Sequence, residues 1–172
     1  VPPRREGRWR RFYRRIRQRY RDRIVENHID LLRLWMARLG SRRVLEIGTG
    51  NGRVLRALLR RRGREISIQG IDLPDAHSVK DVRIPAQPMD ARQLAYAEGS
   101  FDLVYSLHTA EHLADLESVL SEVTRVLVPG GHLLLIVPFE PFRGSHAYME
   151  SLSLTGNPVQ AWRLARRLHV RR

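Results

Sequence analysis

The sequence predicts an α/β protein built on a doubly wound, mostly parallel sheet. Residues 44–55 combine a short apolar run that ends in an acid, three glycines at alternate positions and the start of a helical pattern. Further strand-like apolar runs follow at 66–72, 101–106 and 132–137. Strands that alternate with helices in this way form doubly wound domains, which hold nucleotides at the carboxyl end of the first strand.

The first segment, 44–55, has the composition of a strand, a ligand-binding turn and a helix. Gly48, Gly50 and Gly52 let the backbone turn sharply and approach a ligand closely, because glycine has no Cβ. The following helix offers free N–H groups and a positive dipole end. A dinucleotide-binding turn would have Gly or Ala where this chain has Arg53, and the Gly-Lys-Ser/Thr ending of a P-loop is missing. The turn therefore fits neither the dinucleotide-binding class nor the P-loop class. A tight turn with a purely structural role is the alternative to a ligand-binding loop.

The next strands bring further acids toward this turn. Asp72 ends the run at 66–72, where a carboxylate can accept hydrogen bonds from both hydroxyls of a ribose. Asp75, three residues later, is an alternative acceptor. Asp90 follows a short segment that three prolines interrupt, so the helix expected there must be stunted. Asp90 could also act as the cap of a helix that begins near Ala91.

The remaining elements continue the alternation. Residues 101–106 read as a buried strand, and residues from about 116 to 127 as a helix. A Pro-Gly-Gly turn at 129–131 then leads into a fifth strand at 132–137.

Five short motifs in this part of the chain resemble those of one family. They are Glu-Ile-Gly-Thr-Gly-Asn-Gly at 46–52, Gln-Pro-Met-Asp-Ala at 87–91, Ser-Phe-Asp-Leu-Val at 100–104, Glu-His-Leu at 111–113 and Arg-Val-Leu-Val-Pro-Gly-Gly at 125–131. In order and spacing, residues 43–138 resemble the class I S-adenosylmethionine-dependent methyltransferases, in particular the branch that includes quinone-biosynthesis methyltransferases. The resemblance implies the Rossmann-like class I methyltransferase fold, with S-adenosyl-L-methionine as the cofactor.

The resemblance also implies a set of cofactor contacts. The set is Glu46, Gly48, Thr49, Gly50, Gly52, Asp72, Leu73, Asp90, Ala91 and Ser106. Within it, Glu46 would support the loop near the amino-acid end of the cofactor, and Asp72 would accept the ribose hydroxyls. Asp90 and the backbone N–H of Ala91 would face the adenine. Glu46 as a solvated carboxylate at the end of a strand is the alternative for that residue.

Two histidines are the candidate catalytic residues. Ser106, Leu107 and His108 leave the carboxyl end of the fourth strand, where ligands gather in open α/β sheets. His108 and His112 could act as a general base for an acceptor that must lose a proton. His112 could instead pack against the following helix or cap it. No general base is required if the acceptor is already nucleophilic, and no metal site is predicted.

The implied reaction is methyl transfer by direct SN2 displacement. Methyltransferases that act on the amino groups of adenine or glutamine carry an Asn/Asp-Pro-Pro-Tyr/Phe motif after the fourth strand, and this chain has Ser-Leu-His-Thr at 106–109. An oxygen or carbon nucleophile on a small-molecule or lipid-like acceptor is therefore favoured. One alternative is a catalytically weak, cofactor-binding module that acts through its basic helices on a membrane, nucleic acid or protein partner. An RNA methyltransferase is the third hypothesis.

The net charge of +13 lies at the two ends of the chain. Residues 1–43 carry 15 arginines against four acids, and residues 161–172 carry five arginines and no acid. Apolar and aromatic residues recur at intervals of three and four in the N-terminal segment, which predicts a long amphipathic helix with a break near Asn27. Its apolar stripe could pack on the domain beside the cofactor pocket. An anionic membrane surface or a nucleic acid are the alternative partners for its arginines.

Length and composition predict one domain in three segments. Residues 1–40 form the basic helical segment, 41–141 the S-adenosylmethionine-binding α/β core, and 142–172 a loop and a basic C-terminal helix. No apolar run approaches the roughly 20 residues that span a bilayer. The absence of cysteine excludes disulfides, thiolate metal sites and cysteine nucleophiles. We expect a cytoplasmic protein, located peripherally at the membrane surface if the helix binds lipid.

The C-terminal segment departs from the family pattern. The family's sheet normally ends in an antiparallel strand pair, and the sequence after Pro138 leaves no evident room for two further strands. We therefore expect a sheet that lacks this pair. Because a bare sheet edge invites pairing, a second copy of the chain in a homo-oligomer could cover it.

Overall fold

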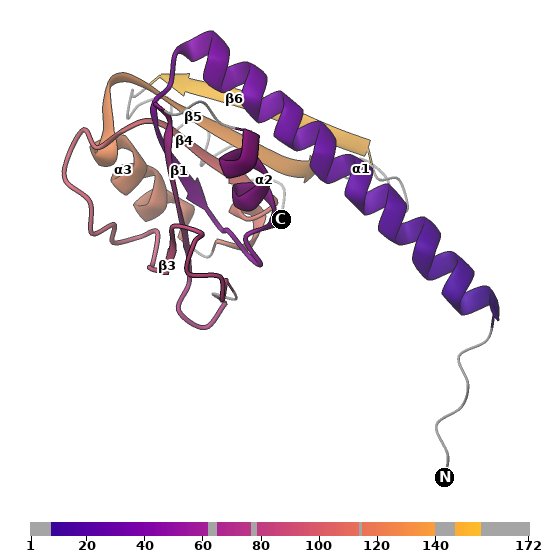
Figure 1. The fold of residues 1–172 in the computed structure, drawn as a ribbon. Helices are drawn as coiled ribbons and strands as arrows, with labels where there is room; N and C mark the ends of the chain where they lie inside the picture. Colours follow the sequence, from indigo (N-terminus) through magenta and orange to yellow (C-terminus); the bar gives the residue numbers. More distant parts are fainter. Residues whose placement is uncertain (1–7, 62–64, 77–78, 114, 140–146, 156–172) are drawn as a thin grey trace.

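The computed structural model describes residues 8–61, 65–76, 79–113, 115–139 and 147–155, and it has the predicted α/β architecture (Figure 1). Its sheet has six strands in the order β3-β2-β1-β4-β5-β6. The strands are β1 (Arg43–Ile47), β2 (Ser67–Asp72), β3 (Ala86–Pro88), β4 (Phe101–Leu107), β5 (Leu127–Phe139) and β6 (Ala147–Thr155). The helices are α1 (Arg8–Leu39), α2 (Arg53–Arg61), α3 (Leu116–Val126) and the one-turn 3-10 helix η1 (Ala110–His112). Strands β1 to β5 are parallel, and β6 runs antiparallel to β5.

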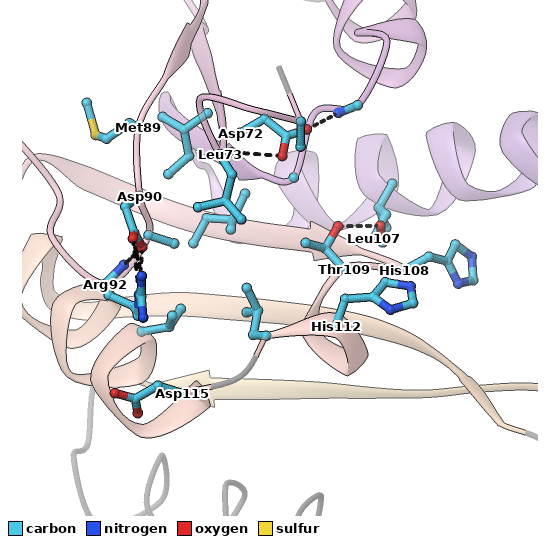
Figure 2. Close-up of a pocket in the computed structure, with 18 residues that line it drawn as sticks. Asp72, Leu73, Met89, Asp90, Arg92, Leu107, His108, Thr109, His112 and Asp115 are labelled. Carbon is cyan, nitrogen blue, oxygen red and sulfur yellow. Dashed lines mark hydrogen bonds and ion pairs between the residues drawn. The ribbon is translucent and has the colours of Figure 1, made fainter. Parts of the chain in front are cut away.

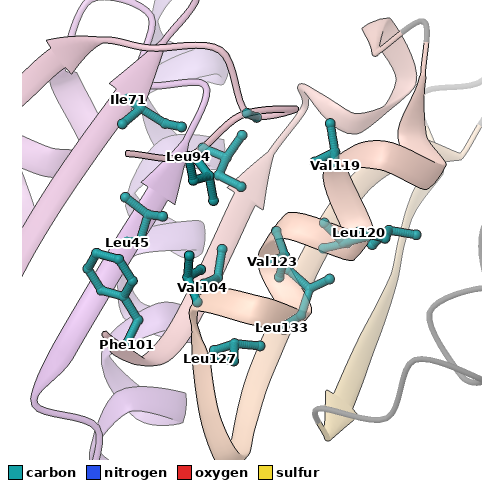
Figure 3. Close-up of a cluster of buried hydrophobic side chains, with 14 of the residues drawn as sticks. Leu45, Ile71, Leu94, Phe101, Val104, Val119, Leu120, Val123, Leu127 and Leu133 are labelled. Atoms are coloured by element: carbon teal, nitrogen blue, oxygen red, sulfur yellow. The ribbon is translucent and has the colours of Figure 1, made fainter. Parts of the chain in front are cut away.

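Helices cover both faces of the sheet, as the doubly wound prediction requires. Helices α1 and α2 lie on one face, and α3 lies on the other (Figure 1). The buried stripe of α3 includes Val119, Leu120 and Val123, which recur at intervals of one and three residues. These side chains pack over Val104 and Leu133 of the neighbouring strands (Figure 3). Strands buried on both faces have near-continuous apolar runs, which explains the pattern that predicted them.

Helix α1 is one continuous helix, so the predicted break near Asn27 is wrong. The helix contains neither Gly nor Pro, and a single Asn costs too little to interrupt it. Ile29, Leu32 and Met36 are buried against α2 and the sheet, so this part of the apolar stripe packs on the domain. The side chains at 8–22 lie outside the described part of the chain. Binding of their arginines to an anionic membrane surface or to a nucleic acid therefore stays a prediction. In the described residues, no helix combines the length and apolarity that a membrane crossing needs.

Strand β6 corrects the prediction for the C-terminal segment. Residues 147–155 form an antiparallel strand against β5, with Leu133 opposite Leu154 and Leu135 opposite Leu152. A loop and a helix were predicted over this stretch. The missed signal is the alternation of Leu with Ser at 151–154, which is the period-two pattern of a strand. The described residues thus hold one antiparallel strand rather than the pair, and the predicted basic helix at the C-terminus lies outside them.

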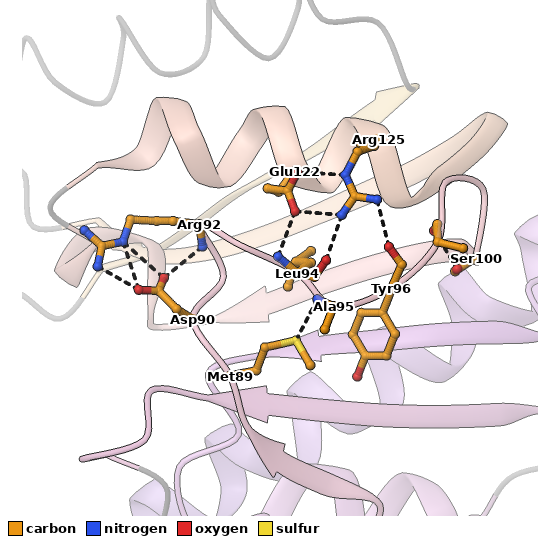
Figure 4. A network of polar contacts seen from close by, with 10 residues as sticks. Met89, Asp90, Arg92, Leu94, Ala95, Tyr96, Ser100, Glu122 and Arg125 are labelled. Atoms are coloured by element: carbon orange, nitrogen blue, oxygen red, sulfur yellow. Dashed lines mark hydrogen bonds and ion pairs between the residues drawn. The ribbon is translucent and has the colours of Figure 1, made fainter.

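The segment between β3 and β4 consists of turns, so the helix expected near Ala91 is absent and Asp90 is not a helix cap. Side chains of α3 hold this segment in place (Figure 4). Glu122 accepts a 2.7 Å hydrogen bond from the backbone N–H of Leu94, and Arg125 donates to the carbonyl oxygens of Leu94 (2.8 Å) and Tyr96 (2.7 Å). The short segment between β2 and β3 likewise has no helix in its described residues, in agreement with the predicted stunting.

Candidate functional site

A cavity of about 540 Å³ opens at the carboxyl ends of β1, β2 and β4 (Figure 2). This volume lies within the range of small-molecule sites, about 300–1,000 Å³. Eight of the twelve predicted site residues line it: Gly48, Gly50, Asp72, Leu73, Asp90, Ala91, His108 and His112. The structure does not bring the other four, Glu46, Thr49, Gly52 and Ser106, to the cavity wall. The sequence therefore located the cavity, although part of the predicted set lies behind its surface.

The glycine loop forms one wall of the cavity. The backbone N–H groups of Gly48 and Thr49 donate to the carbonyl oxygen of Ile71, at 2.8 and 3.1 Å, so the loop is fastened to the end of β2. Gly48 has φ +83°, and a Cβ added to it would collide with the side chain of Thr109. A glycine is required there for two independent reasons, backbone conformation and close approach.

Asp72 is the carboxylate that the structure places at the loop. Its Oδ2 accepts a 2.6 Å hydrogen bond from the N–H of Gly50, and its Oδ1 accepts one of 2.9 Å from the N–H of Leu73. These bonds fix the orientation of the carboxylate at the cavity wall. The alternative acceptor, Asp75, is exposed and does not line the cavity.

Asp90 lies on the cavity wall after β3, where Arg92 holds it. Arg92 donates from its backbone N–H to Oδ1 of Asp90 at 2.9 Å and from its guanidinium to Oδ2 at 2.7 Å (Figure 4). These hydrogen bonds lower the pKa of the Asp90 carboxyl below its usual range, which keeps it ionised and acceptor-only. Arg92 lines the same cavity and was missed from the sequence.

Glu46 lies within the domain and does not reach the cavity wall. Its side chain is buried, and it pairs in register with Tyr105 of β4. Burial raises the pKa of Glu46 to about 8; the Tyr105 hydroxyl opposes this rise and the charge of Asp72 adds to it. In the described part of the chain, Oε2 of Glu46 and the hydroxyls of Tyr105 and Ser106 are buried without a well-aligned hydrogen-bond partner. Glu46 and Tyr105 lie in register on neighbouring strands, whereas Ser106 follows Tyr105 and points to the opposite face of the sheet. Because the Glu46 side chain is buried, the alternative of a solvated carboxylate is wrong for this residue.

The end of β4 supplies the two histidines. His108 has φ +51°, and within the described residues it is the only residue other than glycine with a positive φ. Its N–H donates to the carbonyl oxygen of Ile136 at 2.8 Å, and Thr109 bonds back through its hydroxyl to the carbonyl of Leu107 at 3.1 Å. Backbone strain of this kind concentrates at functional sites. His112, in η1, lines the same end of the cavity (Figure 2).

His112 does not cap the helix that follows it, which was one alternative to a catalytic role for this residue. Asp115 is the N-cap of α3 and accepts a 3.1 Å hydrogen bond from the N–H of Ser118. The side chain of His112 is exposed at the cavity mouth. Its role as a base stays a prediction.

His28 of α1 was not predicted as part of the site. It is 4% exposed, and its ring centroid lies 5.1 Å from that of His108, with the ring planes tilted by 50°. Burial, and then the nearby imidazole of His108, lower the pKa of His28 to about 4. The available signal was a histidine at an apolar position of the helix, four residues after Ile24 and three before Leu31.

Comparisons with known proteins agree with this geometry. Residues 45–135 match the family described as "Methyltransferase domain". The chain is 31% identical over 103 residues to 27-O-demethylrifamycin SV methyltransferase of Amycolatopsis mediterranei, which covers 54% of this chain and 37% of that protein. It is 32% identical over 117 residues to a ubiquinone biosynthesis O-methyltransferase of Ralstonia nicotianae, covering 62% of this chain and 49% of that protein.

The solved structures that resemble the chain include the PH0226 protein of Pyrococcus horikoshii. The TM-score is 0.57 at 28% identity, over 70% of this chain and 59% of that one. The chain spans less than half the length of the two curated relatives it matches here. The region that matches the family, residues 45–135, contains the residues that line the cavity.

Proposed function

Because the chain belongs to the methyltransferase-domain family, we propose that it transfers a methyl group to an oxygen or carbon nucleophile of a small-molecule or lipid-like acceptor. One observation carries the proposal. A single cavity brings together the glycine loop, the ribose-type acceptor Asp72, the ordered Asp90 and the histidine His108. The names of the two curated relatives describe them as methyltransferases, and one is named as an O-methyltransferase.

The cofactor is S-adenosylmethionine, and the residues of the cavity fit it. The loop at Gly48 and Gly50 offers backbone without a Cβ, and Asp72 offers an oriented carboxylate for a ribose. Asp90 offers a second oriented carboxylate for the adenine side.

The chemistry asks the protein mainly to align the reactants and to exclude water. When bound, the cofactor supplies a methyl group already activated by a sulfonium. Asp72 and the loop orient one partner, and the wall at the end of β4 holds the other. We assign to His108 the removal of a proton from an acceptor hydroxyl, a role supported by its position in the cavity lining.

The cavity lining supports an acceptor with an apolar body. Apolar side chains make up much of the wall: Ile47, Ile71, Met89, Leu107, Leu113 and Val119. A cavity of this kind favours a ring or chain over a polyanion, because apolar surface is removed from water when it fills. The absence of an Asn/Asp-Pro-Pro-Tyr/Phe motif after β4 separately favours an oxygen or carbon nucleophile over an amino group.

Calorimetric titration with S-adenosylmethionine and S-adenosylhomocysteine tests the cofactor site. We expect roughly micromolar affinity for the unchanged chain and for Asp75→Ala, whose carboxylate lies off the wall. Asp72→Ala should weaken binding at least about tenfold, because hydrogen bonds to a charged acceptor contribute about 1.5–3 kcal/mol each. Asp72→Asn, which keeps the size of the side chain, separates the lost charge from a loosened loop. Equal binding by all four proteins would contradict the assignment of Asp72.

Radiolabelled methyl transfer to a panel of acceptors tests the reaction. The panel contains catechols and hydroquinones, long-chain phenols, primary amines and short RNA. We expect transfer to the hydroxyl or ring carbon of the first two groups. Transfer confined to amines or RNA would overturn the acceptor class, and cofactor binding without any transfer would favour the catalytically weak module.

A further inference from the structure

The N-terminal helix contributes a buried side chain to the back of the proposed active site. His28 lies on α1, and its ring lies 5.1 Å from that of His108. His108 is 80 residues away in the sequence and directly follows the carboxyl end of β4. His108 lines the cavity, whereas His28 does not. The two imidazoles therefore form a pair with one member at the wall and one behind it.

We propose that His28 is a positioning residue, which holds the imidazole of His108 at the cavity wall so that His108 can accept the proton of a hydroxyl acceptor. This inference rests on the proposed function and narrows it to acceptors that carry an ionisable O–H group. In that step the acceptor oxygen forms a bond to the methyl carbon, and the carbon–sulfur bond breaks with its electron pair left on sulfur. The acceptor proton goes to the ring nitrogen of His108.

The backbone at His108 shows why a second support is needed. A φ of +51° costs a residue with a side chain about 1–3 kcal/mol, and the cost is met by surrounding contacts. The N–H of His108 is held by Ile136, but that bond fixes the backbone and leaves χ1 and χ2 free. The His28 ring lies close enough to the His108 ring to limit where it can turn.

The helix that carries His28 is itself firmly placed. Ile29, Leu32 and Met36 follow His28 on α1 and are buried in the core shared with α2, β1 and β4. An ion pair of 2.9 Å also joins Glu26 of α1 to Arg61 of α2. A rigid element makes a better support for a catalytic group than a loop does.

The electrostatic state of His28 suits this role. With a pKa of about 4, its imidazole is neutral near pH 7. A neutral imidazole can donate from one nitrogen and accept at the other, and it adds no charge that would oppose protonation of His108. Its burial also removes it from competition for the acceptor proton.

The test compares three variants of the full chain. His28→Phe keeps a ring and removes both nitrogens, and His28→Gln keeps a nitrogen donor and an oxygen acceptor. Met36→Leu is the matched control, because Met36 is buried on the same helix but two turns further on. All three should bind S-adenosylhomocysteine as the unchanged chain does, because none of these residues lines the cavity.

Methyl transfer is measured with two probes, a catechol and a thiophenol that is already ionised at the assay pH. His28→Phe should lower kcat for the catechol about tenfold or more with little change in KM, since positioned proton transfer contributes about 10²–10⁴-fold. Transfer to the ionised thiophenol should fall less than twofold. His28→Gln should recover part of the catechol rate, and Met36→Leu should match the unchanged chain. Equal losses for both probes would make His28 a merely structural residue and overturn the proposal.

Histidine side-chain NMR gives a readout that needs no turnover. The ring nitrogen shifts of His108 report its tautomer, and His28→Phe should change them where Met36→Leu does not. Unchanged His108 signals in His28→Phe would overturn the inference. Failure of the unchanged chain to methylate either probe would count against the proposed function, while the NMR comparison would still decide whether His28 orients His108.

Discussion

The two ends of the cavity are built in different ways. At the cofactor end, the glycine loop and Asp72 are held by backbone N–H groups within a stretch of 25 residues, from Gly48 to Asp72. At the end that we propose for the acceptor, the ring of His108 packs near the ring of His28 from α1, and the side chain of Thr109 fills the space over Gly48. The comparison teaches that one half of the site is a local backbone structure, whereas the other half depends on distant elements packing correctly.

The largest effect should come from the contact that joins the two ends. Gly48→Ala requires a side chain at φ +83° and drives its Cβ into Thr109. Strain of about 1–2 kcal/mol and overpacking of about 1–3 kcal/mol should add, and cofactor binding should become undetectable. Calorimetry and thermal unfolding measure the two losses.

Gly130→Ala is the matched control for this prediction. Gly130 also has a positive φ, +78°, but a Cβ there meets nothing within 4 Å. It should show the strain alone and bind the cofactor normally. Equal effects of the two substitutions would remove the steric contact with Thr109 from the account of the site.

A second prediction concerns Glu46, whose side chain is buried. Its pKa in the folded protein is about 8, above the ordinary 4.5, so the folded state keeps a proton that the unfolded state releases. The resulting stability is fully present below about pH 4.5 and is lost as the pH rises through about 8. Glu46→Gln should flatten this dependence, with a difference on the order of 5 kcal/mol at most across the range.

Denaturant unfolding of both proteins at several pH values from 5 to 9 measures the effect of Glu46→Gln. The free energy of unfolding of the unchanged chain should fall relative to the variant as the pH rises. Parallel pH profiles would mean that Glu46 is ionised in the folded state, against the burial described above.

The smallest effect should come from Arg92, which orients Asp90 at the cofactor end. Arg92→Ala removes a half-exposed guanidinium, so the loss of affinity for S-adenosylhomocysteine should be about two- to fivefold and stability should change by less than about 1 kcal/mol. The control is Arg83→Ala. Arg83 donates hydrogen bonds to Asp81 with the same two-residue spacing, but neither residue lines the cavity. A weaker affinity in both variants would point to general charge rather than to Asp90.

The sequence was most informative where neighbouring residues settle the structure. The strand, glycine loop and helix at 44–55 follow from local patterns, and the motif order placed Asp72, Asp90 and His108 at one cavity. The strand at 147–155 was missed, although Ser and Leu alternate at 151–154. This short alternation becomes a strand because it pairs with β5, and that pairing is not visible in the local sequence. The pattern was short, and a helix-like reading competed with it.

What the sequence by itself determined is the order of elements, the family and the position of the cofactor loop. These features depend on periodicity, on glycine at positive φ and on acids at strand ends, which are properties of short segments. Only the tertiary structure decided that Glu46 is buried next to Tyr105 and that His28 stands behind His108. Such pairs join residues that are 59 and 80 positions apart, and no local pattern records which side chains meet when a helix packs on a sheet.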